Sequence, residues 1–313
     1  MSLIEKAVQR LDALKQANGA DETVPPKAAP VVAEAVHEQV HDSGRTSSSV
    51  PLATPVPTPN PNVSREVRID LERLGAMGMV TPDVPRAAIA EEFRLIKRPL
   101  LRNATVSGPS AIENGSLIMV TSAMPGEGKS FTAINLAVSM AMELDYTVLL
   151  VDADVSRPSV LNRLGLPPER GLMDVLSGEV SDLGDVLLRT NIEKLSILPA
   201  GMPHPRATEM LASESMNRLL EQIANRYADR IIVFDSPPLL VTTEARVLAT
   251  HMGQVVIVVE AGRTTHATVK QALATIENCP VKLMVLNKSR ENAAGSYYGY
   301  GYGYGAEPRS EAA

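Results

Sequence analysis

The sequence predicts an α/β fold built on a doubly wound, mostly parallel sheet. Apolar runs of strand length recur between residues 117 and 286 and are separated by stretches with helical periodicity. Two of these runs end in aspartate, where a parallel sheet presents side chains at its carboxyl edge. The first third of the 313-residue chain has too little periodic apolar pattern to build a second domain, so one α/β domain is expected.

The N-terminal segment is expected to lie outside this domain. Apolar side chains recur at helical spacing from Ile4 to Leu14, which predicts an amphipathic helix over residues 1–20. Such a helix would dock on a partner or a membrane surface; a solvated helix that frays is an alternative, because so short a helix is marginal in water. Residues 21–64 are rich in proline, alanine, valine and serine, which predicts a disordered linker.

Two short segments open the predicted domain, which spans residues 65–290. Residues 65–79 carry several apolar side chains and are expected to be ordered, and residues 87–97 have helical spacing that Pro99 is expected to end. Three charged side chains of this helix, spaced by three, are expected to share one face: Glu91, Arg94 and Lys97. A solvated cluster of charges is one interpretation of that face.

The loop at residues 123–130 lies between an apolar run and a helical stretch, which is the context of a phosphate-binding loop. Glycines at 126 and 128 let backbone N–H groups surround phosphate oxygens, at a helix start whose dipole favours anions. Lys129 can then reach the β and γ phosphates, and Ser130 can hold Mg²⁺. ATP is therefore the predicted ligand of a P-loop NTPase domain. The predicted loop contacts are Pro125, Gly126, Glu127, Gly128, Lys129, Ser130 and Phe131.

Acidic side chains follow two other apolar runs. One run ends in Asp152-Ala153-Asp154 and another ends at Asp235, as in Walker A′ and B motifs. A single aspartate after a buried strand is more often a helix cap or turn residue, but three of them with a phosphate loop favour a metal site. Carboxylates at this edge bind Mg²⁺ directly or through water, so Ser130, Asp152 and Asp235 are the expected ligands.

Three more apolar runs supply further strands of the sheet, at residues 195–198, 255–259 and 283–286. Asn287 follows the last run, at the edge where a nucleotide base is expected. An ordinary asparagine of a strand-end turn is an equally good interpretation.

Five of the seven tyrosines crowd near the C-terminus and alternate with glycines: Tyr297, Tyr298, Tyr300, Tyr302 and Tyr304. Such crowding is not a core pattern. Alternating glycine denies the stretch a stable fold, so residues 291–313 are expected to form a flexible tail whose hydroxyls can enter another active site as phosphoacceptors. A low-complexity tail used for weak association is the alternative.

In order and spacing these motifs resemble those of the bacterial tyrosine kinases that act in capsule and exopolysaccharide export. The resemblance covers residues 89–286 and the tail, and rests on SAMPGEGKS, VLLVDADVSRP, IIVFDSPPLL and SYYGYGYGYG. The chain also carries the stretch EEFRLIKRPLL and has no apolar segment long enough to span a membrane. In these features it looks most like the soluble exosortase-associated tyrosine autokinases.

The resemblance implies a tyrosine autokinase that forms ring-like homo-oligomers, phosphorylates tails between subunits and regulates exopolysaccharide synthesis and export. A membrane-embedded polysaccharide co-polymerase would recruit and activate it at the inner membrane. The resemblance also implies that Arg157 complements phosphate charge and that Asn287 contacts adenine. In the family a Glu-x-x-Arg-x-x-Arg helix packs against the neighbouring subunit; here Lys97 stands at its last position, where a point charge replaces a bidentate contact.

Phosphoryl transfer depends mainly on positioning and charge neutralisation. Lys129 and the loop amides are expected to clamp the phosphates, with Asp152 beside the metal. Asp154 is a candidate acceptor for the tyrosyl proton, and the sequence leaves Asp152 and Asp154 both open as the base.

Other protein classes fit less well. Partitioning ATPases carry an additional lysine at the position of Met124, so a switch-type P-loop ATPase without kinase activity is the remaining rival. A formal net charge of −6 and the lack of basic clusters make nucleic acid an unexpected partner. Cys279 is the lone cysteine, which excludes an internal disulfide and a paired-thiol metal site. Without a signal peptide or an apolar stretch of ~20 residues, a cytoplasmic location is expected.

Overall fold

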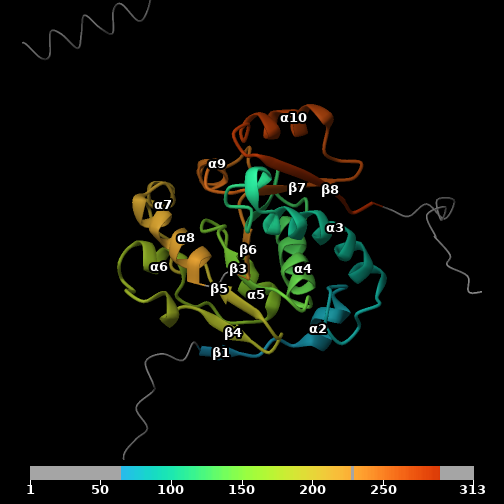
Figure 1. Ribbon diagram of the computed structural model, residues 1–313, viewed down its shortest axis with the longest axis horizontal. Helices are drawn as coiled ribbons and strands as arrows, with labels where there is room; N and C mark the ends of the chain where they lie inside the picture. Colours follow the sequence, from blue (N-terminus) through green and yellow to red (C-terminus); the bar gives the residue numbers. More distant parts are fainter. Residues whose placement is uncertain (1–64, 227–228, 290–313) are drawn as a thin grey trace, which may run out of the picture. The chain divides into compact units, whose positions relative to one another are not determined.

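The computed structural model describes residues 65–226 and 229–289. An eight-stranded sheet runs in the order β1-β4-β5-β3-β6-β2-β7-β8, with helices on both of its faces (Figure 1). Neighbouring strands are parallel except for β4 and β5, which are antiparallel. The predicted doubly wound, mostly parallel α/β fold is therefore confirmed.

The strands alternate with helices along most of the described chain. The strands are β1 (Arg65–Val67), β2 (Leu117–Ser122), β3 (Thr147–Asp152), β4 (Leu188–Thr190), β5 (Leu195–Leu198), β6 (Arg230–Asp235), β7 (Gln254–Glu260) and β8 (Val281–Asn287). The α-helices are α2 (Leu71–Ala76), α3 (Ala88–Thr105), α4 (Lys129–Ala141), α5 (Val160–Leu164), α6 (Leu172–Leu176), α7 (Ala207–Leu211), α8 (Glu214–Arg226), α9 (Thr243–Ala249) and α10 (His266–Ala274).

The central strands are near-continuous apolar runs because helices cover them on both faces. Successive side chains of a strand point to opposite faces. Leu149 of β3 and Phe234 of β6 accordingly belong to one buried cluster, with residues of α7, α8 and α9. Leu150 and Val233 belong to another cluster, with residues of α3 and α4. This packing fixes the carboxyl ends of β2, β3 and β6 side by side.

Pro99 does not end a helix as expected. Helix α3 continues through it to Thr105, and the prediction of a stop there is wrong. Proline removes one helical hydrogen bond, which leaves the carbonyl four residues earlier without its donor. That residue is Leu95, which is exposed, so water can satisfy its carbonyl. Leu100 and Leu101 are buried just beyond the proline and anchor the second half of the helix.

The segment after residue 65 is ordered, as expected. Strand β1 pairs with β4, and Leu74 of α2 is buried. Asn191 holds the connection from both sides, because its amide oxygen accepts from the Ile69 N–H at 2.7 Å and its Nδ2 donates to the Ile69 carbonyl at 3.0 Å.

Three predicted segments lie outside the described residues: the helix over 1–20, the linker over 21–64 and the tyrosine tail over 291–313. They stay predictions. Among the described helices, none has the length and apolar character needed to cross a membrane.

Candidate active site

The predicted phosphate loop connects β2 to α4 at the carboxyl edge of the sheet. Gly126 and Gly128 take left-handed backbone conformations, with φ of 88° and 104°. A Cβ atom on Gly128 would lie 2.0 Å from Asn287 Nδ2, so no larger residue fits there. Glycine at 128 is therefore required both by the backbone and by its neighbour.

The loop is braced from behind by Glu127, whose side chain is buried. Its Oε2 accepts from the Met124 N–H at 2.7 Å, and its Oε1 accepts from the Thr264 hydroxyl. Its backbone carbonyl accepts from Asn287 Nδ2 at 2.8 Å. The carboxylate of Glu127 thus shapes the loop, and Asn287 ties the end of β8 to it.

Lys129 meets two of the three predicted aspartates. Its Nζ lies 2.6 Å from Asp154 Oδ2 and 3.6 Å from Asp235 Oδ1. Burial alone would lower the pKa of Lys129, but the charges of Asp235 and Asp154 outweigh it and raise the pKa above the ordinary lysine value. Lys129 is accordingly a fixed positive charge at the floor of the site.

Asp152 lies at the end of β3 and is buried. Its Oδ2 accepts from the backbone N–H groups of Ser159 and Val160, at 3.0 Å each, whereas its Oδ1 has no hydrogen-bond partner. Burial, followed by the nearby charge of Asp235, raises the pKa of Asp152 to about 7.

Asp235 ends β6 directly beside Asp152 in the sheet register. Both of its carboxylate oxygens are buried without a hydrogen-bond partner. Burial raises the pKa of Asp235, against the opposing charge of Lys129. Buried carboxylate oxygens without donors are costly unless a cation or another partner satisfies them.

These oxygens suit a hard divalent cation, which prefers oxygen ligands. The hydroxyl of Ser130 lies near the Asp235 carboxylate. It is 2.9 Å from the Ser159 hydroxyl and 3.3 Å from Lys129 Nζ. Within the described residues, no three or more His, Cys, Asp or Glu side chains converge into a complete metal site. A cation here would therefore need the hydroxyl of Ser130 and ligand oxygens as well.

Above the loop lies a cavity of about 770 Å³, within the usual range of ligand pockets. Of the predicted nucleotide contacts, all except Glu127 line it: Pro125, Gly126, Gly128, Lys129, Ser130, Phe131, Arg157 and Asn287. Asp154 also lines it. The structure therefore brings these residues together, while Asp152 and Asp235 lie outside its lining.

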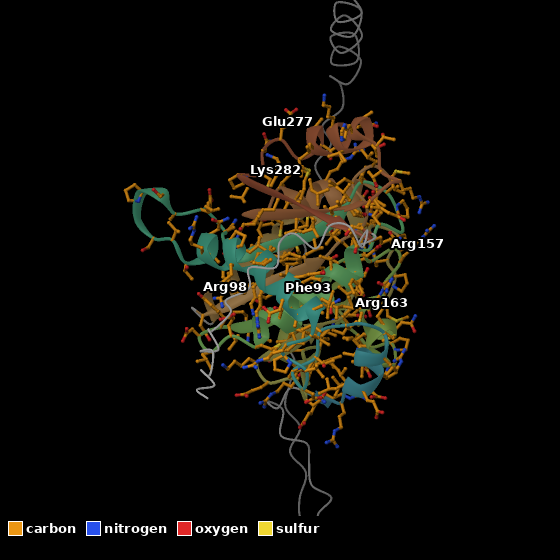
Figure 2. The ribbon with its side chains drawn as sticks, turned by 90° about the vertical axis from the view of Figure 1, so that its right-hand side faces the viewer. Phe93, Arg98, Arg157, Arg163, Glu277 and Lys282 are labelled. Carbon is orange, nitrogen blue, oxygen red and sulfur yellow. The ribbon has the colours of Figure 1, made fainter. Side chains whose placement is uncertain are left out.

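Part of the cavity wall was not predicted from the sequence: Ser156, Ser159, Arg163, Pro237, Pro238, Val241, Thr242 and Lys288. Pro237 and Pro238 follow Asp235 after one residue, Ser236, so their place beyond a strand end was a usable signal. Arg163 carries no such signal, because it reaches the site only through the fold of α5. Figure 2 shows Arg157 and Arg163 on the same side of the molecule.

The charged face predicted for residues 91–97 does not form. Glu91 and Arg94 make an exposed ion pair, but Lys97 is buried against α4, where its Nζ lies 2.8 Å from Glu143 Oε1 and donates to the Ser139 carbonyl. Each helical residue turns by about 100°, so positions six apart differ by about 120° around the axis. Lys97 therefore points inward, and the expectation of a shared face was wrong.

Comparison with known proteins decides the family. Residues 115–289 match the AAA domain family. The tyrosine-protein kinase CpsD of Streptococcus agalactiae is 34% identical over 186 residues, which cover 58% of this chain and 79% of the relative. The chain belongs to the bacterial tyrosine kinase family. It is a P-loop protein-tyrosine kinase, as the motifs predicted.

Two further proteins are similar to this kinase. The kinase domain of the Escherichia coli tyrosine kinase ETK has a TM-score of 0.60 at 27% identity, over 77% of this chain and 94% of that domain. The succinoglycan biosynthesis transport protein ExoP of Rhizobium meliloti (strain 1021) is 33% identical over 226 residues, which are 71% of this kinase and 28% of ExoP. The resemblance to exosortase-associated autokinases stays a prediction.

Proposed function

We propose that this kinase transfers the γ-phosphoryl group of ATP to the tail tyrosines of a neighbouring copy. The observation that carries the proposal is the contact of Lys129 with Asp154 and Asp235, with Asp152 opposite Asp235 in the sheet register, beside a cavity of about 770 Å³. The acceptors are Tyr297, Tyr298, Tyr300, Tyr302 and Tyr304, which lie outside the described residues.

Mg²⁺ would be held by Ser130, Asp152 and Asp235. The support is the chemistry of the donors: a hydroxyl and two buried carboxylates, of which Asp152 Oδ1 and both oxygens of Asp235 accept no hydrogen bond. When bound, the ion would neutralise charge on the β and γ phosphates. Lys129 and the loop amides bind the same phosphates, and Arg157 at the cavity wall adds positive charge.

In the transfer, the tyrosyl oxygen forms a bond to the γ phosphorus as the bond from that phosphorus to the β–γ bridging oxygen breaks. ADP leaves with the electron pair of the broken bond. The tyrosyl proton passes to a carboxylate, either Asp154 in the cavity wall or Asp152 beneath it. Asp152 is the last residue of β3, and Asp154 follows two residues later.

The proposed biological role is control of exopolysaccharide synthesis and export. ExoP, a relative named for succinoglycan biosynthesis and transport, supports this role.

We propose ring-like homo-oligomers that loosen as tail phosphates accumulate, because each adds a charge of about −1.5 to −2 to an acidic chain. A membrane-embedded polysaccharide co-polymerase would recruit the cytoplasmic kinase to the inner membrane. Since Lys97 is buried within its own subunit, a contact of α3 with a neighbour would depend on Glu91 and Arg94.

Transfer between copies is tested with two full-length variants. The enzyme carries alanine at the five tail tyrosines, and the acceptor carries Lys129→Met with its tail intact. With Mg²⁺ and ATP, phosphate should appear on the acceptor tail. ATP hydrolysis without phosphate on any tail would instead favour the switch-ATPase alternative and contradict the proposal.

A further inference from the structure

Strand β8 forms one edge of the sheet, beside β7 (Figure 1). It has seven residues, and β7 is its only partner among the described strands. The Asn287 carbonyl at its end accepts from the Ala261 N–H, just beyond β7, at 2.9 Å. A strand residue directs its N–H and C=O to the same side, and successive residues alternate. Three residues therefore direct their backbone groups away from β7: Lys282, Met284 and Leu286.

The side chains of these three residues share one face of β8. Met284 and Leu286 are 61% and 63% exposed, whereas Leu283 and Val285 on the other face pack against a buried cluster. Edge strands usually carry charges, prolines or bulges that prevent pairing with another strand. Strand β8 has no proline, and its two most exposed side chains are apolar. This edge is therefore suited to receive a further strand.

A hollow of about 420 Å³ lies on this side of β8, next to α10. Leu273 and Ala274 give it an apolar wall, and Lys270, Glu277 and Lys282 surround that wall with charge. Lys282 Nζ donates to the Glu277 carbonyl at 3.0 Å, and Figure 2 shows the two residues near each other. An aromatic ring that ends in a hydroxyl group suits such a wall.

The tail has the sequence pattern of a strand that fits this edge. Tyrosine occupies every second position from Tyr298 to Tyr304, with glycine between, so an extended tail puts these tyrosines on one face. This stretch follows β8 in the chain, and residues 288–297 are long enough to turn it back antiparallel to β8. A tether of this kind gives an effective concentration on the order of millimolar, which favours the chain's own tail over the tail of a second copy.

We propose that residues 298–304 form a further strand, antiparallel to β8 of the same chain, which withdraws these tyrosines from other copies. Each tyrosine then lies opposite a residue of the exposed face. A shift by one residue would turn the tyrosines to the face of Leu283 and Val285, which is already packed. The pairs are Tyr298 with Leu286, Tyr300 with Met284, and Tyr302 with Lys282.

The glycines make this docking reversible, because glycine within a strand weakens it. A docked tail and a released tail would thus exchange, and only the released tail could reach another copy. The inference goes beyond the proposed function, since the docked strand exists whether or not its tyrosines are phosphorylated.

The test is amide hydrogen exchange of the full-length chain, resolved to single residues by mass spectrometry. In the proposed pairing the Tyr300 N–H donates to the Met284 carbonyl, so Tyr300→Pro removes that bond. Gly301→Pro is the matched control, because the Gly301 N–H points away from β8 and proline favours an extended residue before it. The Met284 amide should exchange at least tenfold more slowly in the parent and in Gly301→Pro than in Tyr300→Pro.

Three outcomes would overturn the inference. Equal exchange of the Met284 amide in the parent and in Tyr300→Pro would show that the tail does not pair with β8. Loss of protection in Gly301→Pro as large as in Tyr300→Pro would contradict the assigned pairing. Protection that disappears on about a hundredfold dilution of the parent would assign the edge to a second copy of the chain, because docking within one chain does not depend on concentration.

Discussion

Lys129 Nζ and Asp154 Oδ2 are 2.6 Å apart, and both side chains are largely buried. The lysine that is expected to clamp the phosphates is therefore paired with the carboxylate that can accept the tyrosyl proton. If Lys129 turned to phosphate oxygens, Asp154 would lose its cation. We therefore propose that this ion pair links nucleotide binding to the release of the Asp154 carboxylate.

Replacement of Asp152, which ends β3, or of Asp154, two residues beyond it, should slow the transfer step. We expect Asp152→Asn or Asp154→Asn to slow single-turnover tail phosphorylation at least 100-fold in the variant that removes the base. Asparagine keeps the shape of the side chain but cannot take the proton. Quenched-flow measurement of tail phosphate at saturating ATP gives the rates, and unchanged rates in both variants would contradict the assignment.

The raised pKa of Asp152 predicts how stability depends on pH in the presence of EDTA. Because its pKa is about 7 in the fold, against an ordinary value of 3.8, the folded chain holds a proton that the unfolded chain has released. This contribution is complete below the ordinary value and is lost as the pH rises through about 7. The free energy of unfolding should fall by on the order of 2 kcal/mol between pH 5 and 8. Urea titrations measure this pH dependence. If Asp152→Asn showed the same fall in the free energy of unfolding between pH 5 and 8, Asp152 would not be its source.

Gly128→Ala should disable the loop. The new Cβ would meet Asn287 Nδ2, and the φ of 104° is unfavourable for alanine. We expect nucleotide affinity to fall at least tenfold, as measured by titration with a fluorescent ATP analogue. Gly178→Ala is the control, because Gly178 also has a positive φ, of 81°, but a Cβ atom there would have no neighbour within 4 Å. Equal affinities for the two variants would show that the Asn287 contact does not matter.

Substitution of Lys97 and substitution of Glu143, which form an ion pair, should destabilise the fold by different amounts. Glu143→Gln leaves a buried lysine charge without its carboxylate, whereas Lys97→Met removes that charge and keeps most of the volume. Glu143→Gln should therefore lower the free energy of unfolding by about 2 kcal/mol, and Lys97→Met should lower it by about 1 kcal/mol. Chemical denaturation measures both, and a larger cost for Lys97→Met would show that the bond to the Ser139 carbonyl dominates.

The sequence predicted the central sheet because buried parallel strands are continuous apolar runs, as in β2, β3 and β6. It missed β1 and β4, since three residues are too few to show a pattern. Pro99 misled the prediction because the solvent exposure of Leu95, which makes the proline tolerable, is a property of the fold. Much of the lining of the cavity above the phosphate loop was predictable, because a single local motif supplies a large part of it. A cavity of about 680 Å³ at the ends of β3 and β5 was not predictable, because most of its lining residues come from 158–170 and 199–203, which meet only in three dimensions.

The most direct test of tail autophosphorylation is intact-mass spectrometry of the full-length kinase after incubation with Mg²⁺ and ATP, with Lys129→Met as the control. We expect multiple additions of about 80 Da, the mass of a phosphoryl group, that map to Tyr297 through Tyr304 in the unsubstituted chain alone. The same number of phosphoryl groups on Lys129→Met, or ATP hydrolysis without any phosphoryl group on the unsubstituted chain, would contradict tail autophosphorylation.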